Sequence, residues 1–522
     1  MLGLLLLSGC HTMGGSSLLE WWHNGLKVGP NYARPAAAVA DNWIDANDPR
    51  LRPERVDYAY WWRQFNDPLL DSMVQRASNQ NLTLRAAGFR IMEARARRQI
   101  AAGALFPQLQ QATADYLRIN TSSAVANPAP IPDFDDWDVG FDMAWEIDVW
   151  GRFRRAVEEQ DARLDASIES YDDFLVILQA EVALTYVQIR TFQERIRYAT
   201  QNANSQEQLY NLTVVRQREG AVSDLDVQQA ANIWHTTAAT IPGFEAGLRQ
   251  SQNALAVLLG VPPYDMTAEL GDDHDIPTAP RDVVVGIPAE LLGRRPDVRR
   301  AEREVAAQSA RIGIAVSDLY PTVSILGTLG WNAEDLDDLF TSDAFRGAVG
   351  PSIRWNILNY GRIRNNVIAQ DARFQTLIAE YEQTVLEANA EAEDAIIAFL
   401  KSQAELEQTQ LAATAAEKAL TLSVTQYREG AADYGRVLLA TDFLTDSQDQ
   451  LALSQANVAT SLIQIYRALG GGWTTRLMLP NIATEVQPAV VREEILPDEE
   501  DLLQLPDNDE ISDPILPPMP PE

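Results

Sequence analysis

The stretch from Asp136 to Trp150 constrains the fold of this 522-residue chain more than any other part of the sequence. Apolar and aromatic side chains take its odd positions, and carboxylates take most of its even positions. The odd set is Trp137, Val139, Phe141, Met143, Trp145, Ile147 and Val149, and the even set is Asp136, Asp138, Gly140, Asp142, Ala144, Glu146 and Asp148. Strand side chains alternate between two faces, so the pattern predicts a strand with one apolar and one acidic face. A half-buried strand of a soluble protein alternates in the same way. A stretch of this length is also typical of a tilted strand that crosses a bilayer, which needs about 9–11 residues.

A second copy of the pattern lies about 210 residues downstream. Its apolar positions are Val349, Pro351, Ile353, Trp355 and Ile357, and Gly350, Ser352, Arg354 and Asn356 lie between them. The same offset relates residues 151–154 to 361–364, residues 160–163 to 370–373, and residues 218–221 to 428–431. A constant offset over such a length indicates an internal duplication.

Two long segments, 152–219 and 362–429, contain neither proline nor glycine, and each precedes a glycine turn. Apolar residues recur in the first at intervals of three and four, which predicts an amphipathic helix of roughly 100 Å. Each helix is expected to return after its turn, the first to about Leu259 with Ser223 as its cap and the second to about Leu469.

Each predicted helical hairpin follows a shorter helix and two strands. The shorter helices are expected from Asp71 to about Leu105 and up to Leu319, where Phe106-Pro107 and Tyr320-Pro321 stop them. The strands are expected over residues 109–119, 136–150, 323–331 and 349–357.

Four strands cannot close a membrane barrel, because the smallest bacterial barrels have about eight, and an open sheet edge is not tolerated in lipid. The sequence contains no run of about 18 apolar residues, so a helical membrane span is not expected. Several copies must therefore pool their strands in a ring. The predicted object is a channel with a long helical stalk.

Composition excludes several other classes of function. A net charge of −32 argues against nucleic-acid binding, and a single cysteine excludes a disulfide framework. The four histidines, His11, His23, His235 and His274, lack metal-ligand spacing. The sequence has no P-loop and no nucleophile elbow, so we expect no enzyme activity, no cofactor and no metal.

The two ends of the chain differ from its body. Leu7-Ser8-Gly9-Cys10 resembles the bacterial lipobox, which implies a signal peptide over residues 1–9 and lipidation of Cys10. The alternative is an ordinary cysteine in a leader, and no Lys or Arg precedes the apolar run as signal peptides require. Residues 484–522 are rich in Pro, Asp and Glu, which predicts a disordered acidic tail that either docks a partner or is simply solvated.

Several motifs together resemble the outer membrane factor family, the TolC-like and NodT-like exit ducts of tripartite efflux pumps. They are FNDPLLDSMVQRASNQNLTLRAA (65–87), FPQL (106–109), PAELLGRRPDVRRAE (288–302), YPTVSILG (320–327) and the two REGA turns. VGPNYARP (28–35) and the lipobox resemble its lipoprotein branch. The resemblance implies a mainly α homotrimer with a twelve-stranded outer-membrane barrel and an α-helical periplasmic tunnel. Its tips would meet a periplasmic adaptor coupled to an inner-membrane RND-type transporter.

The resemblance and the duplication together suggest a domain plan. Residues 10–66 form a lipid-anchored extended segment, residues 67–271 the first repeat, residues 272–287 a linker and residues 288–475 the second repeat.

Three groups of candidate site residues follow from the duct interpretation. Asp138, Asp142 and Glu146 are expected in the barrel lumen, where they would favour cations. The adaptor-contacting tips are expected at Arg218, Gly220, Ser223, Leu225, Asp226, Tyr427, Arg428 and Gly430. Asp433, Tyr434, Arg436 and Asp442 are gate candidates, with capping or coiled-coil contacts as the alternative role of each. Relatives often place a bulky aliphatic residue where Gly435 stands and an Asp where Leu439 stands, so an acidic constriction is in doubt.

Two other functions compete with the duct. A lipid-anchored coiled-coil scaffold without a pore would need no strands of membrane-spanning length at matched positions in the two halves. A hydrolase that uses tunnel carboxylates has no supporting motif.

Overall fold

A computed structural model describes residues 18–52, 54, 58–120, 122, 124, 126, 133–271 and 275–478. The predicted signal peptide, Cys10 and the acidic tail therefore lie outside the described residues. The chain divides into two units, of which the first ends at Arg476 and holds the fold described below.

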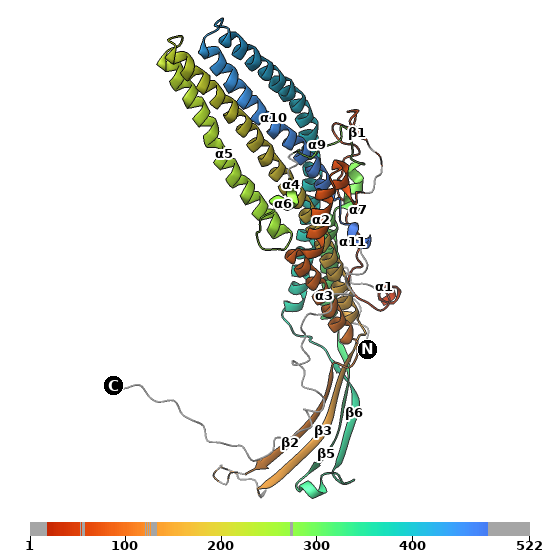
Figure 1. The fold of residues 1–522 in the computed structure, drawn as a ribbon. Coiled ribbons are helices and arrows are strands. Elements are labelled where there is room, and N and C mark those ends of the chain that lie inside the picture. The colour runs from red at the N-terminus through yellow and green to blue at the C-terminus, as the bar shows by residue number, and fades with distance from the viewer. Residues whose placement is uncertain are drawn as a thin grey trace, which may run out of the picture. The chain divides into compact units, whose positions relative to one another are not determined.

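Four strands form one antiparallel sheet in the order β2-β3-β5-β6 (Figure 1). Their bounds are Leu109–Ile119, Phe134–Ile147, Thr322–Ala333 and Phe345–Arg354. The two halves of the chain meet where β3 pairs with β5, with Phe141 opposite Leu329. Among the described residues no strand pairs with the outer edge of β2 or of β6, so both edges are open in a single chain.

The fourth strand differs from its prediction at both ends. It begins at Phe345, four residues earlier than expected, and it ends at Arg354 rather than at Ile357. A tight turn ends the strand, because the Ile357 N–H donates to the Trp355 carbonyl at 3.1 Å.

The prediction of one continuous helix from Asp71 to Leu105 is wrong, because two helices occupy this segment. The structure has α2, Pro68–Gln80, and α3, Leu82–Gly103, with Asn81 between them in an extended conformation. The Asn81 side chain accepts from the Leu84 N–H at 3.0 Å and donates to the Leu258 carbonyl at 2.9 Å. The sequence analysis treated Asn81 as one more helical residue, although Asn is a preferred N-cap. The matching helix of the second half is α8, Pro296–Ser317.

The two long helical hairpins confirm the predicted duplication. They consist of α4, Arg152–Arg218, with α5, Asp224–Leu258, and of α9, Arg362–Arg428, with α10, Tyr434–Ala468. Three pairs of glycines at the same offset have positive φ: Gly151 and Gly361, Gly220 and Gly430, and Gly260 and Gly470. Each pair lies where a helix begins or ends, and glycine adopts a positive φ at such positions without strain.

One helix among the described residues, α4, contains an 18-residue window that is long and apolar enough to cross a membrane. The sequence analysis expected none. Within the chain 67% of that window is buried, as in the core helix of a soluble protein.

The remaining elements are short. They are α1 (Leu18–His23), β1 (Leu51–Arg52), η1 (Trp61–Phe65), α6 (Thr267–Leu270), β4 (Val283–Val284), η2 (Pro288–Glu290), α7 (Leu291–Arg294), η3 (Leu336–Asp338) and α11 (Thr475–Met478). The predicted linker contains β4, which pairs in parallel with β1. The main core lies where α2, α4, α9 and α10 meet, and its largest buried side chains include Trp62, Tyr186, Phe399 and Tyr466.

The segment that precedes the first repeat packs tightly against the helices. Gly29 lies so close to Gly313 of α8 that a Cβ on Gly29 would be 2.4 Å from the Gly313 Cα. Arg155 of α4 is buried beside this contact and donates to the carbonyls of Val28 and Gly29 at 3.2 and 3.1 Å. The contact therefore fixes the N-terminal segment to the body of the fold.

A methyl group at Gly29 should loosen this contact. We expect Gly29→Ala to lower the thermal midpoint of the purified protein, because overpacking against backbone costs about 1–3 kcal/mol. Gly25→Ala is the matched control: Gly25 also has a positive φ, of 62°, but nothing lies within 4 Å of its Cβ position. Equal midpoints for the two variants would contradict the packing argument.

Candidate functional site

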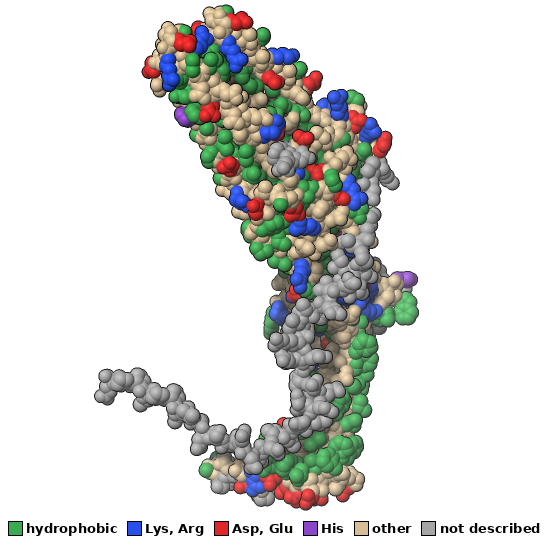
Figure 2. Space-filling model, viewed as in Figure 1, with side chains coloured by type: hydrophobic (Ala, Val, Ile, Leu, Met, Phe, Trp, Pro, Cys, Tyr) green, Lys and Arg blue, Asp and Glu red, His purple; other side chains and the backbone are tan. Residues whose placement is uncertain are grey.

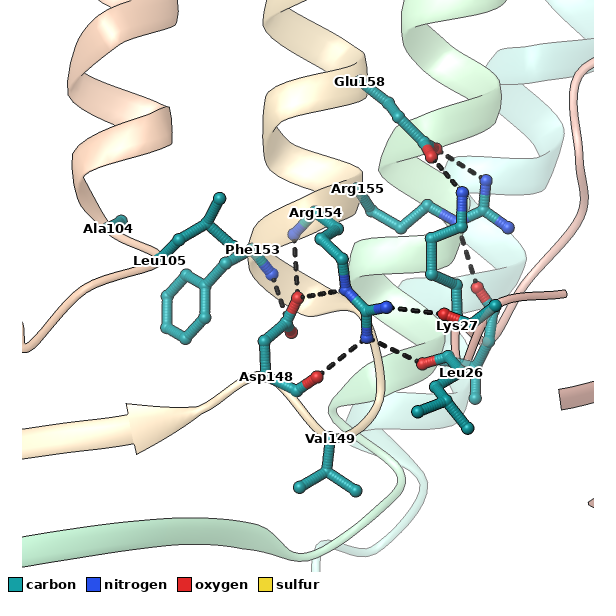
Figure 3. Close-up of polar contacts among 12 residues, drawn as sticks. Leu26, Lys27, Ala104, Leu105, Asp148, Val149, Phe153, Arg154, Arg155 and Glu158 are labelled. Atoms are coloured by element: carbon teal, nitrogen blue, oxygen red, sulfur yellow. Dashed lines mark hydrogen bonds and ion pairs between the residues drawn. The ribbon is translucent and has the colours of Figure 1, made fainter. Parts of the chain in front are cut away.

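The junction between β3 and α4 joins the sheet to the long helices (Figure 3). The Asp148 carboxylate accepts from the backbone N–H groups of Phe153 and Arg154 at 3.1 and 3.0 Å and from Arg154 Nε at 2.9 Å. A carboxylate at a helix N-terminus satisfies unpaired N–H groups and complements the helix dipole. Asp148, the last acid of the alternating stretch, therefore caps α4 and is not part of the strand, which ends at Ile147.

Charged side chains bind the N-terminal segment across the same junction. Arg154 Nη2 donates to the Leu26 carbonyl at 2.9 Å, and Glu158 pairs with both Lys27 and Arg155 (Figure 3). Burial disfavours the charge of Glu158, but hydrogen bonds from Lys27 and Arg155 hold its pKa below the ordinary value. The sheet, the helix and the N-terminal segment are thus held in one arrangement.

The register gives the sheet one polar and one apolar face. On the polar face Asp138 lies opposite Asp115 and Asn332, and Asp142 lies opposite Gln111 and Thr328. On the other face Trp137, Val139, Phe141, Met143 and Trp145 lie beside apolar residues of β5, among them Ile325, Leu329 and Trp331. Figure 2 shows hydrophobic side chains gathered along the sheet at one side. One face therefore suits lipid and the other suits water.

The three acids predicted in the lumen lie on the polar face, but their partners differ. Asp138 pairs with Arg346 of β6, and Glu146 lies 3.6 Å from Arg152. The Asp142 side chain has no ion pair or hydrogen bond among the described residues. The sequence analysis missed Arg346 because it began the fourth strand after this residue.

The two hairpin tips have the same backbone geometry. At the first tip the N–H groups of Gly220 and Ala221 donate to the carbonyls of Gln217 and Arg216, and the second tip repeats the pattern with Gly430 and Ala431. Ser223 and Asp226 form a capping box at the start of α5, as the cap prediction requires. At the second tip Asp433 caps α10 by accepting from the Arg436 N–H at 3.2 Å.

Most of the predicted tip residues are on the surface. The side chains of Arg218, Ser223, Leu225 and Arg428 are exposed, and Leu225 is 64% exposed. These residues form one patch at the end of the first hairpin and a smaller one at the end of the second.

Tyr427 and Tyr434, predicted as an adaptor contact and a gate residue, are instead buried within the chain. Their rings meet edge to face at 5.6 Å, and Arg216 of the first hairpin lies 4.4 Å from the Tyr427 ring. Arg216 also donates to the Tyr427 carbonyl. Burial, together with Tyr427 and Asp226, raises the pKa of Tyr434 to about 12. This cluster joins the two hairpins behind their tips, and the sequence analysis did not identify Arg216.

The other gate candidates lie on an exposed face of α10. Arg436 and Asp442 are exposed there, and the neighbouring Leu439 and Phe443 are 57% and 65% exposed. The position where relatives often carry an acid is therefore occupied by an exposed leucine. Asp433 forms the capping bond that the sequence analysis gave as its alternative role.

The Tyr427 hydroxyl is buried without a hydrogen-bond partner among the described residues. We therefore expect Tyr427→Phe to raise the free energy of unfolding by about 1 kcal/mol, because an unsatisfied polar group is removed. Tyr186→Phe is the control, since the Tyr186 hydroxyl donates to Asp67 at 2.7 Å and accepts from Arg190. This variant should be destabilised by about 1–3 kcal/mol in the same denaturation experiment. Destabilisation by Tyr427→Phe of the same size would contradict the assignment.

The described residues contain no group of three or more His, Cys, Asp and Glu side chains placed to hold a metal ion. The candidate surfaces are thus a polar sheet face, two hairpin tips and the exposed face of α10.

Comparisons with known proteins agree with this geometry. The family model described as "Outer membrane efflux protein" matches twice, over residues 73–261 and 287–471. The chain is 28% identical to Nodulation protein T of Rhizobium leguminosarum bv. trifolii, over 86% of this chain and 95% of that protein. It is 28% identical to the toluene efflux pump outer membrane protein TtgF of Pseudomonas putida, with the same two coverages. The solved outer-membrane channel OprN superposes with a TM-score of 0.79 at 33% identity, over 85% of this chain and 99% of that one.

Proposed function

We propose a route by which substrates pass through this chain. The chain belongs to the outer membrane efflux protein family and is an outer-membrane exit channel of tripartite efflux pumps. Members of this family are transport channels rather than enzymes. The observation that supports the route most directly is the amphipathic four-stranded sheet with two open edges, continued by four long helices.

Closure of the sheet requires other copies of the chain. The free edge of β2 can pair with the free edge of β6 in the next copy, and repetition around a symmetry axis leaves no edge in lipid. Three chains with four strands each give a barrel of about twelve strands, within the range of bacterial barrels. The apolar face, with Trp137, Phe141 and Trp145, then faces lipid, and the face with Asp142 lines the lumen.

The helices carry the lumen away from the membrane. Each of α4 and α9 has 67 residues, which corresponds to roughly 100 Å. The turns from α4 to α5 and from α9 to α10 lie at the end of this stalk away from the sheet (Figure 1). Gly220 and Gly430 are the glycines of these two tips. We assign them the contact with a periplasmic adaptor, which couples the duct to an inner-membrane transporter of the RND type.

Two further assignments rest on the sequence. Lipidation of Cys10 would anchor the N-terminal segment beside the barrel. The domain plan, with repeats at 67–271 and 288–475, agrees with the helix bounds and remains part of this proposal. A scaffold without a pore would not require a sheet with one apolar and one acidic face.

The Asp142 side chain, which has no ion pair among the described residues, should contribute its full charge to the barrel lumen. We expect the reconstituted channel to prefer cations weakly, and Asp142→Asn to move the reversal potential in a salt gradient towards zero. Asp41→Asn is the control, because this substitution removes the same charge from an exposed residue of the N-terminal segment. A channel that prefers anions, or one that Asp142→Asn leaves unchanged, would contradict the placement of Asp142 in the lumen.

Leu225 tests the tip contact. We expect Leu225→Asp to abolish most efflux in cells that depend on this duct, because a buried interface does not tolerate an unpaired charge. Leu225→Met keeps the apolar surface and should retain efflux. Both variants should still form trimers in the outer membrane, measured by size and by membrane fractionation. Normal efflux by a correctly assembled Leu225→Asp protein would count against the proposed contact.

A further inference from the structure

A large cavity with many arginines lies between the helices next to the sheet. It has a volume of about 600 Å³, and residues of α3, α4, α8 and α9 line it. The lining contains two carboxylates, Glu93 and Glu304. It contains six arginines: Arg90, Arg97, Arg163, Arg300, Arg311 and Arg373. In a chain with a net charge of −32, the lining itself therefore carries more arginines than carboxylates.

The position of the cavity follows from helix packing. The four helices lie in a row, because α3 packs on α4, α4 on α8 and α8 on α9. The outer helices α3 and α9 line the cavity together with the inner helices α4 and α8. Side chains from all four helices meet around one cavity only where the row curves inward, so the cavity lies on the concave face of the row. The N-terminal segment occupies the opposite face, where Tyr32 donates to Glu302 and Lys27 pairs with Glu158. When copies of the chain close a ring, the concave face becomes the wall of the lumen.

The arginines retain donors for a ligand. Glu159 pairs with both Arg163 and Arg311 at 2.8 and 2.9 Å, and Asp173 lies 3.4 Å from Arg300. Arg97 pairs with Glu93 at 2.5 Å, and Glu380 lies 3.7 Å from Arg373. The Arg90 guanidinium has no ion pair or hydrogen bond among the described residues. Each guanidinium has five N–H donors, so an arginine with one carboxylate partner still has donors that face the cavity.

Four further polar side chains line the cavity. Ser167 and Ser170 contribute hydroxyl groups, and Gln160 and Gln308 contribute amides. Arginines with hydroxyl and amide neighbours recognise carboxylates, sulfonates and phosphates, which accept paired N–H bonds from a guanidinium. The volume lies within the range of pockets that hold small molecules.

We propose that this cavity, which we call the arginine pocket, binds small molecules with two or more carboxylate, sulfonate or phosphate groups as they pass along the tunnel. The proposal rests on the proposed duct for its claim that the pocket faces a lumen. It identifies a class of cargo, polyanionic small molecules, for which the tunnel wall offers a binding site.

Binding of the trianionic dye 8-hydroxypyrene-1,3,6-trisulfonate to the purified full chain tests the proposal by fluorescence anisotropy. We expect the triple variant Arg90→Gln, Arg97→Gln and Arg373→Gln to bind the dye about tenfold more weakly, because charge-assisted hydrogen bonds are lost. These arginines pair at most with carboxylates on the surface, so their loss leaves no buried charge.

The control is a second triple variant, which loses the same three positive charges from helix faces outside the pocket. It combines Arg85→Gln, Arg95→Gln and Arg364→Gln, which are exposed residues of α3 and α9 outside the pocket lining. The control should bind within about twofold of the unmodified chain, since long-range charge alone is screened by salt. Equal weakening of both triple variants, or no weakening of either, would overturn the proposal.

The acidic tail supplies a second source of carboxylates. A chain that ends at Ala483 lacks residues 484–522 and should bind the dye with unchanged affinity. A tenfold gain on truncation would show that the tail occupies the pocket and would overturn its assignment to cargo.

Imaging and conductance of the same preparations separate the two proposals. Preparations without a three-fold tube would contradict the duct itself. Conducting tubes that bind the dye equally in all variants would contradict the arginine pocket alone.

Discussion

The open outer edges of β2 and β6 are the constraint on which the rest of the structure depends. A strand edge presents unpaired N–H and C=O groups, which cost several kcal/mol each in hydrocarbon. The apolar face of the sheet, with Trp137, Phe141 and Trp145, requires such an environment, so the edges must be closed by other copies of the chain. Symmetry, the polar lumen and the position of the long helices all follow from this requirement.

The junction at Asp148 transmits that geometry to the helices. Gly151 and Gly361 turn the chain from strand to helix at matched positions, and the bonds of Asp148 to the first turn of α4 fix the direction of the helix. The tunnel wall then begins directly beside the sheet, and the arginine pocket begins about two to three turns into α4 and α9. The charge of the proposed lumen therefore changes along its length, from acidic beside Asp142 to basic at Arg90 and Arg373.

The sequence predicted the elements whose signal is local or repeated. Alternation predicted β3, the absence of proline and glycine predicted α4 and α9, and the constant offset predicted the duplication. The break at Asn81 had a local signal, the N-cap preference of Asn, which the long helical pattern outweighed. The start of β6 at Phe345 depends on pairing with β5, which no local pattern reveals. Tyr427 is buried because Arg216 and Tyr434 pack on it, and the arginine pocket unites four helices that are far apart in sequence.

Negative-stain imaging of the detergent-purified full chain tests the central claim most directly. The account predicts particles with three-fold symmetry, in which a short barrel continues into a stalk of roughly 100 Å, the length of α4 and α9. Monomeric or dimeric rods without a barrel would contradict it, because the edges of β2 and β6 would then be unpaired in a chain that forms no channel.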